Sequence, residues 1–193
     1  MADRASNRVN DPACPTSELD EGAIAKILRR LNQSFRTQTT PAALGQVAIE
    51  QLSQTLQLDQ ALLYPYEAGD AVLSALVQFG TPGLTPIFPQ ELHLRQLPLL
   101  QQSLAQVKVA IFEQASGNHG DDPALWSILA APIGYLGTAY GLLLLARRGC
   151  DSANAQGSDG PAWSDREQAF VEDVAAQLGG AIAYIFSKSK TKA

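Results

Sequence analysis

The stretch SILAAPIGYLGTAYGLLLLARR, Ser127 to Arg148, decides the fold. It carries no charge before its last two residues, and a run of about 20 apolar residues is long enough to cross a membrane as a helix. Its proline and glycines, however, divide it into two strand-length pieces, 127–133 and 141–146, with turn-forming residues between them. We therefore interpret the stretch as a β-hairpin and expect no membrane span.

Both strands of this hairpin are apolar on both faces. Strands joined by a short loop are antiparallel, and an antiparallel strand with one solvated face alternates apolar and polar residues. The segments ILAAPI and GLLLLA do not alternate. We therefore expect a sheet that is covered on both faces, with the rest of the chain supplying both covers.

Composition and charge restrict the class of protein. A chain of 193 residues with 46% hydrophobic and 17% charged residues is long enough for one domain with a real core. A net charge of −5 gives no electrostatic footprint for nucleic acid. The first residues contain no apolar leader segment, so we expect a cytoplasmic protein. Its two cysteines, Cys14 and Cys150, form neither a disulfide framework nor a metal-binding spacing.

Helical periodicity appears at both ends of the chain. Residues 1–16 are polar and predicted to be disordered. Residues 17–36 show the apolar periodicity of a helix. Thr40-Pro41 is typical of a capped helix start, and this second helix is predicted to end near Leu56. The apolar stripe of the first helix consists of Ile24, Ile27, Leu28, Leu31 and Phe35.

The last helix is the clearest element. SDRE, Ser164 to Glu167, is a capping box, and an apolar stripe follows it for about six turns. Gly179 and Gly180 interrupt this stripe and allow another backbone to approach closely. We expect the tail at 188–193 to be basic and frayed. The stripe consists of Phe170, Val171, Val174, Leu178, Ile182 and Ile185.

The middle of the chain supplies the remaining strands and one insertion. Ala61–Tyr66 and Ala71–Phe79 are predicted to be strands flanking a hairpin loop, and 107–112 a further strand. Between them lies the proline-rich insertion 80–106, with a short helix predicted over 97–106. The fold class is therefore α+β: an antiparallel sheet with the terminal helices on one face and a pocket-covering insertion on the other.

A cover made of loops and one short helix often leaves a cavity, and a small molecule would bind there. Tyr64 and Tyr66 point to one face of their strand by its period of two. Equally, these side chains could simply close the core and leave no void. The candidate ligand contacts are Tyr64, Tyr66, Phe79, Phe88, His93 and Leu97.

The hairpin, together with the closing helix WSDREQAFVEDVAAQLGGAIA, resembles the GAF domain family, which is related to PAS domains. The resemblance covers about residues 24–186 and implies a single GAF-like domain at 17–187. It also implies a sensory or regulatory role rather than an enzyme. We expect non-covalent binding of a small molecule and signalling through a protein partner. The alternative is a ligand-free dimerisation or scaffolding module.

The resemblance allows each ligand class of the family to be compared with this sequence. Bilin-binding members carry a cysteine beside the pocket, and residues 80–126 contain none, so we expect no covalent bilin and leave the cofactor unknown. Cyclic-nucleotide-binding members share a dispersed Asn-Lys-Phe-Asp-Glu set, which has no convincing match in this sequence. The family's methionine-sulfoxide-reducing enzymes need cysteines converging on the pocket, which two distant cysteines do not supply.

Other candidate sites are weaker. His93 could contact a ligand, but a histidine in such a position is more often a surface or capping residue. His119 with Asp121 and Asp122 could hold a metal weakly, but such a loop is usually only solvated, so we predict no metal site and no catalytic residue. The amphipathic stripes at 24–35 and 170–186 predict a homodimer through the terminal helices.

Overall fold

The computed structural model describes residues 20–116, 124–148 and 163–190. At its centre is a five-stranded antiparallel sheet in the order β3-β1-β7-β6-β5. Its strands are β1 (Gln60–Pro65), β3 (Val77–Gly80), β5 (Ala110–Ser116), β6 (Ala124–Tyr135) and β7 (Thr138–Arg148). A small second sheet pairs β2 (Val72–Ser74) with β4 (Glu91–His93).

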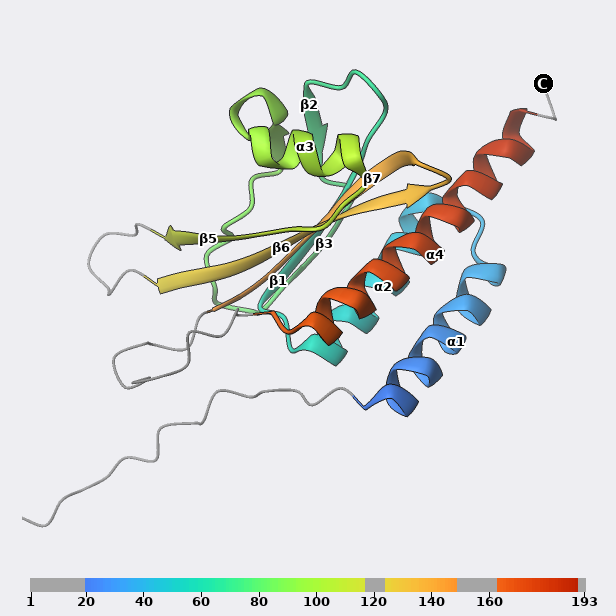
Figure 1. Cartoon of the computed structure of the whole chain (residues 1–193), viewed down its shortest axis with the longest axis horizontal. Helices are drawn as coiled ribbons and strands as arrows, with labels where there is room; N and C mark the ends of the chain where they lie inside the picture. The colour runs from blue at the N-terminus through green and yellow to red at the C-terminus, as the bar shows by residue number, and fades with distance from the viewer. Residues whose placement is uncertain (1–19, 117–123, 149–162, 191–193) are drawn as a thin grey trace, which may run out of the picture.

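Helices and the small sheet cover the two faces of the central sheet (Figure 1). On one face lie α1 (Glu21–Thr37), α2 (Pro41–Leu56) and α4 (Asp165–Lys190). On the other lie α3 (Pro98–Gln106), the short 3-10 helix η1 (Leu94–Gln96) and the β2–β4 pair. The expected α+β arrangement with two different covers is confirmed. The predicted tail 1–16 lies outside the described residues, and the C-terminal tail, expected to fray from 188, is helical through Lys190.

The two-sided apolar pattern of the hairpin has the expected consequence. Because successive strand residues point to opposite faces, Leu129 and Ile133 join a helix-side core, while Ile128 joins an insertion-side core. Leu143 and Leu144 divide in the same way on β7. The sequence 127–148 is therefore the middle layer of a three-layer domain and not a membrane helix.

The hairpin turn is shorter than predicted. We expected seven residues of loop between the strands, but Tyr135 pairs with Thr138, which leaves a two-residue turn of Leu136 and Gly137. Both residues have positive φ, 50° and 77°, as a type I′ turn requires. Glycine meets that demand without strain, whereas a leucine with positive φ is unusual. Leu136 is also 86% exposed.

Replacing Leu136 by asparagine is expected to stabilise the fold. Asparagine tolerates the left-handed region and is favoured before glycine in type I′ turns, so Leu136→Asn should raise the free energy of unfolding by about 1 kcal/mol. Urea unfolding monitored by circular dichroism measures the change. Leu136→Val, a β-branched residue at the same positive φ, should have the opposite effect. Equal stability of the two variants would contradict this description of the turn.

The prediction of one strand over Ala71–Phe79 is wrong. The chain forms β2 and β3 instead, and it changes sheets between them, where Ala75 N donates to Gln90 O (2.8 Å) and Leu76 N donates to Leu63 O (2.8 Å). Pairing of β2 with β4 places Leu73 in the insertion-side core. The apolar residues of the segment thus serve two sheets.

The predicted helix starts are confirmed in atomic detail. Thr40 Oγ1 accepts the N–H of Ala43 (3.3 Å), with Pro41 at the first helical position. In the capping box, the N–H of Glu167 donates to Ser164 Oγ (3.3 Å), and Ser164 N donates to Glu167 Oε2 (2.8 Å). The same carboxylate forms a two-pronged ion pair with Arg147 of β7 (2.7 and 3.0 Å), which fixes the start of α4 to the sheet.

Gly179 brings α4 against the sheet backbone. A Cβ at this position would lie 2.3 Å from Gly134 O and 2.7 Å from Gly134 C. The close approach expected from the glycine pair is therefore made within the chain. At Gly180 an added Cβ would meet only the ring of Tyr135, at 3.4 Å.

Among the described residues, α4 is also the helix long and apolar enough to cross a membrane, over Asp165–Lys188. A core helix can have the same length and composition, and α4 contacts β6, β7, α1 and α2. Its apolar stripe belongs to the helix-side core.

Candidate functional site

A pocket of about 260 Å³ opens at the edge of the insertion-side cover. Its walls come from three segments: the β1–β2 loop, η1 and α3. It is lined by Tyr66, Gly69, Asp70, Ala71, Leu94, Arg95, Gln101 and Leu104.

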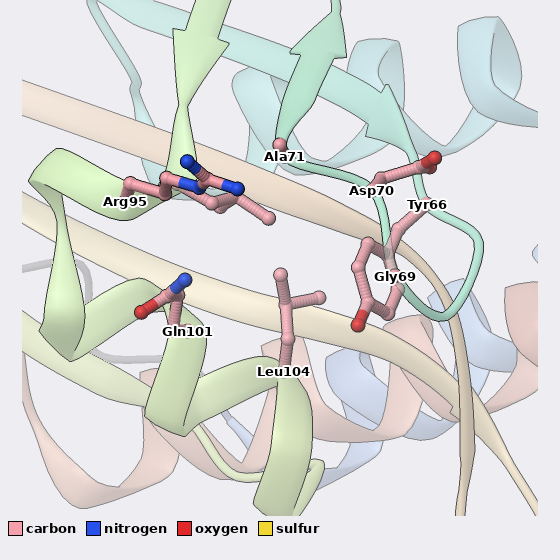
Figure 2. Close-up of a pocket in the computed structure, with 8 residues that line it drawn as sticks. Tyr66, Gly69, Asp70, Ala71, Arg95, Gln101 and Leu104 are labelled. Carbon is pink, nitrogen blue, oxygen red and sulfur yellow. The ribbon is translucent and has the colours of Figure 1, made fainter.

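The β1–β2 loop forms a closed turn at one side of this pocket. Asp70 Oδ2 accepts the N–H of Glu67 (2.8 Å), and Asp70 N donates to Glu67 O (3.0 Å). Gly69 has a φ of 104°, a conformation that glycine adopts without strain. One oxygen of the Asp70 carboxylate is thus engaged in this turn, and Figure 2 shows the carboxyl group directed away from Arg95.

The opposite wall of the pocket carries the positive charge of Arg95, and the pocket floor is apolar. Leu94 N donates to Ala71 O (3.0 Å), which ties η1 to the β1–β2 loop. Leu94 and Leu104 are 2% and 3% exposed and form the floor. Figure 2 shows Arg95 reaching over the pocket from one side and the Tyr66 ring facing it from the other, while Gln101 and Leu104 rise from α3.

The space directly between sheet and insertion is filled. Tyr64 is fully buried, and its hydroxyl donates to Pro89 O (2.5 Å). Burial raises the pKa of the Tyr64 phenol far above its ordinary value, so the hydroxyl keeps its proton. Gln60 adds two bonds to the insertion, donating to Thr85 O (2.8 Å) and accepting from Ile87 N (2.9 Å). The insertion is therefore fixed to the sheet at several points.

Of the six residues predicted to contact a ligand, the pocket includes Tyr66. Tyr64 and Phe88 lie in the filled insertion-side core, and Leu97 packs against its edge. His93 is exposed on β4. Phe79 lies on the other face, because it pairs with Ala61 and packs against the helix-side core.

Arg95 and Gln101 were missed, although the sequence contains one signal for Arg95. Between Arg36 and Lys108 it is the single Lys or Arg of the sequence. A lone cation in an otherwise neutral or acidic stretch is a candidate anion contact. Gln101 carries no comparable signal, because exposed glutamines are common on helices.

A second hollow of about 350 Å³ lies between α1 and α2. Its rim is polar, and Arg30 and Glu50 place opposite charges on it. Within the described residues no group of three or more His, Cys, Asp or Glu side chains is arranged to hold a metal ion. His119 and both cysteines lie outside those residues.

Comparison with known proteins identifies the family. The GAF domain model matches residues 40–182, so the chain belongs to the GAF domain family, whose members are generally sensory or regulatory domains. No curated protein sequence matches the chain.

Solved structures share the fold at low sequence identity. The GAF domain of an Acinetobacter phosphoenolpyruvate-protein phosphotransferase is 19% identical (TM-score 0.61, covering 84% of this chain and 94% of that one). The free methionine-R-sulfoxide reductase from Neisseria meningitidis, solved in complex with its substrate, is 10% identical (TM-score 0.65, covering 92% of this chain and 96% of that one). The phycoerythrobilin-bound GAF domain of a cyanobacterial phytochrome is 17% identical (TM-score 0.62, covering 86% of this chain and 96% of that one). These likenesses establish the fold, and they include both a pigment-binding domain and an enzyme.

Proposed function

We propose that this GAF domain is a sensor that binds a small carboxylate non-covalently in the pocket beside α3 and signals by contact with a protein partner. The observation that carries the proposal is Arg95, whose exposed side chain reaches over a pocket that the buried Leu94 and Leu104 also line. A guanidinium recognises a carboxylate with two parallel N–H donors, and Gln101 can add a further hydrogen bond. At about 260 Å³ the pocket has room only for a ligand of a few heavy atoms, such as a small carboxylate.

The proposed role is binding rather than catalysis, although the methionine-sulfoxide reductase shows that this fold can carry an enzyme. The two cysteines of this sequence, Cys14 and Cys150, are far apart along the chain, and both lie outside the described residues. The absence of cysteine from 80–126 also supports the expectation that no bilin is bound covalently.

Thermal unfolding in the presence of small mono- and dicarboxylates tests the proposal. A carboxylate at about 100 times its dissociation constant should raise the midpoint by about 5 °C or more. Arg95→Gln should abolish the shift, and Ala71→Phe should abolish it by filling the pocket. Arg36→Gln, which removes an exposed arginine from α1, is the matched control and should keep it. An equal shift in Arg95→Gln and the parent chain would refute the assignment of the site.

A ligand-free interaction module is the second candidate. It is favoured by the filled core around Tyr64 and Phe88 and by a pocket below the range of about 300–1,000 Å³ typical of ligand sites. In that case α1 and α4 would form a two-fold interface between copies. Gly179 no longer supports this dimer, since it contacts Gly134 of its own chain. Light scattering that gives twice 20.6 kDa, with no thermal response to any carboxylate, would favour the module.

A further inference from the structure

The lining of the pocket beside α3 divides into a polar end and an apolar part. Figure 2 shows the Gln101 amide on the same side of the pocket as Arg95, so these two side chains form the polar end. Leu104 follows Gln101 by three residues on α3 and therefore lies beside it on the same helix face. In Figure 2 the Leu104 side chain stands between Gln101 and the Tyr66 ring. The hydrogen-bonding groups are thus gathered at one end of the pocket.

The apolar part of the pocket is continuous with the insertion-side core. Leu94 and Leu104 belong to that core, and Tyr66 packs against it. Apart from the Tyr66 hydroxyl, these side chains offer a ligand only hydrocarbon and ring surface. A charged group placed on this surface would lose hydration without gaining a partner, which is unfavourable, whereas an apolar group would gain by leaving water. This part of the pocket therefore favours the apolar body of a ligand.

The loop opposite Arg95 carries negative charge. Residues 66–71 contain two acids, Glu67 and Asp70, both exposed, and no Lys or Arg. Among the described residues that line the pocket, Arg95 is the single cation. A second carboxylate on a ligand would therefore approach two like charges on this loop without a cation to balance it.

We propose that this pocket selects monocarboxylates with a short apolar body, and that the β1–β2 loop rejects a second carboxylate. This inference rests on the proposed function, because it takes Arg95 as the partner of the bound carboxylate. The carboxylate would pair with Arg95 and accept a hydrogen bond from Gln101, and the ligand body would lie against Leu104 and Tyr66. An α-amino acid fits less well, because its ammonium group adjoins the carboxylate and would face the Arg95 guanidinium.

Calorimetric titration of the full chain with small acids at neutral pH tests this selectivity. Acetate, propionate and butyrate should bind more tightly in that order, by about fourfold for each added methylene. Succinate, which has the same chain length as butyrate, should bind about tenfold more weakly than butyrate, and so should α-aminobutyrate. Arg95→Gln should abolish the binding of all five acids.

Ala71→Lys should remove the preference for butyrate over succinate. Ala71 is exposed and lines the pocket on the side of the β1–β2 loop, so a lysine there would supply the missing cation and tighten succinate about tenfold. Ala68→Lys adds the same charge at an exposed position of the same loop outside the pocket lining, and as the matched control it should keep the preference.

Asp70→Asn provides a second, more conservative variant. Asparagine keeps a side-chain oxygen that can accept the N–H of Glu67, so the turn should persist, but it removes one negative charge from the loop. Succinate should therefore bind about threefold more tightly to this variant, while butyrate binding should stay unchanged. Thermal unfolding of each variant without ligand confirms that the fold is kept.

The outcomes separate this inference from the proposed function. Succinate binding as tight as butyrate binding, with both abolished by Arg95→Gln, would overturn the selectivity and leave the carboxylate site standing. The absence of any binding that depends on Arg95 would overturn both. If Ala71→Lys and Ala68→Lys changed succinate binding equally, or if neither Ala71→Lys nor Asp70→Asn changed it, the pocket wall formed by the β1–β2 loop would not set the selectivity.

Discussion

Gly179→Ala is expected to lower the free energy of unfolding by about 3 kcal/mol, although alanine is the better helix former. The added methyl would lie 2.3 Å from the carbonyl oxygen of Gly134 and 2.7 Å from its carbonyl carbon. Both contacts are to backbone, so no side-chain rotation can relieve them. Helix α4 would have to move away from β6, which would loosen the packing of Leu178 and Ile182 in the helix-side core.

Gly180→Ala provides the control one residue further along the same helix. Its new methyl would touch only the Tyr135 ring, at 3.4 Å, and that exposed ring can move. The gain in helix propensity should therefore raise stability by up to about 1 kcal/mol. Urea unfolding followed by tryptophan fluorescence compares the two variants. If Gly179→Ala were as stable as Gly180→Ala, the close contact between α4 and β6 would not exist in solution.

Glu167→Gln is expected to cost about 3 kcal/mol at neutral pH. Glutamine keeps the size of the side chain and can still accept the N–H of Ser164, but it leaves the Arg147 guanidinium without its counter-charge. The Glu167 side chain is 5% exposed and that of Arg147 is 20% exposed, so water compensates for little of the loss. Arg147 also lies 4.3 Å from the centre of the buried Trp163 ring.

The cost of Glu167→Gln should depend on pH in a defined direction. Burial raises the pKa of the Glu167 carboxyl, but the hydrogen bonds and charge of Arg147, together with the bonds to Ser164, outweigh burial and leave this pKa below its ordinary value. A carboxyl with a lowered pKa in the folded state stabilises above its unfolded pKa, near 4.3, and loses that contribution as the pH falls through the folded value.

The stability difference between the parent chain and Glu167→Gln should therefore be full at neutral pH and shrink below about pH 4. Chemical unfolding over a series of pH values measures it. Glu172→Gln, on an exposed position of the same helix, should show almost no difference at any pH. If the difference in free energy of unfolding between the parent chain and Glu167→Gln stayed constant down to about pH 3, the charge of Glu167 would not be what stabilises its contact with Arg147.

The layers of the fold could be predicted from the sequence because their signals are local. The apolar pattern of 127–148 required two covers, and Thr40-Pro41 and the Ser164–Glu167 box marked helix starts that the structure confirms. The division of Ala71–Phe79 could not be predicted in the same way. Whether its residues pair with β1 or with β4 depends on partners far away in the chain.

The site was harder to predict for the same reason. Alternation predicted that Tyr64 and Tyr66 share one face of their strand, and the structure shows that this is the insertion side. The Tyr64 hydroxyl, however, is satisfied by the carbonyl of Pro89, 25 residues further along. Register placed Phe79 on the helix side, which its own segment does not reveal. Arg95 reaches the pocket because β4 ends at His93 and η1, which follows directly, turns the chain.

Gly134 determines how stiff the connection between the two covers is. On one side, a Cβ here would lie 2.1 Å from Val107 Cγ1, and Val107 caps α3, the helix that carries Gln101 and Leu104. On the other side, the Gly134 carbonyl is in close contact with Gly179 of α4. At this point the middle layer has no side chain that could absorb a displacement by changing rotamer. We therefore expect a shift of α3 at Val107 to reach α4 through the β-branched Val107 side chain and the Gly134 backbone, with little slack, while the insertion fixed around Tyr64 keeps the rest of the cover in place.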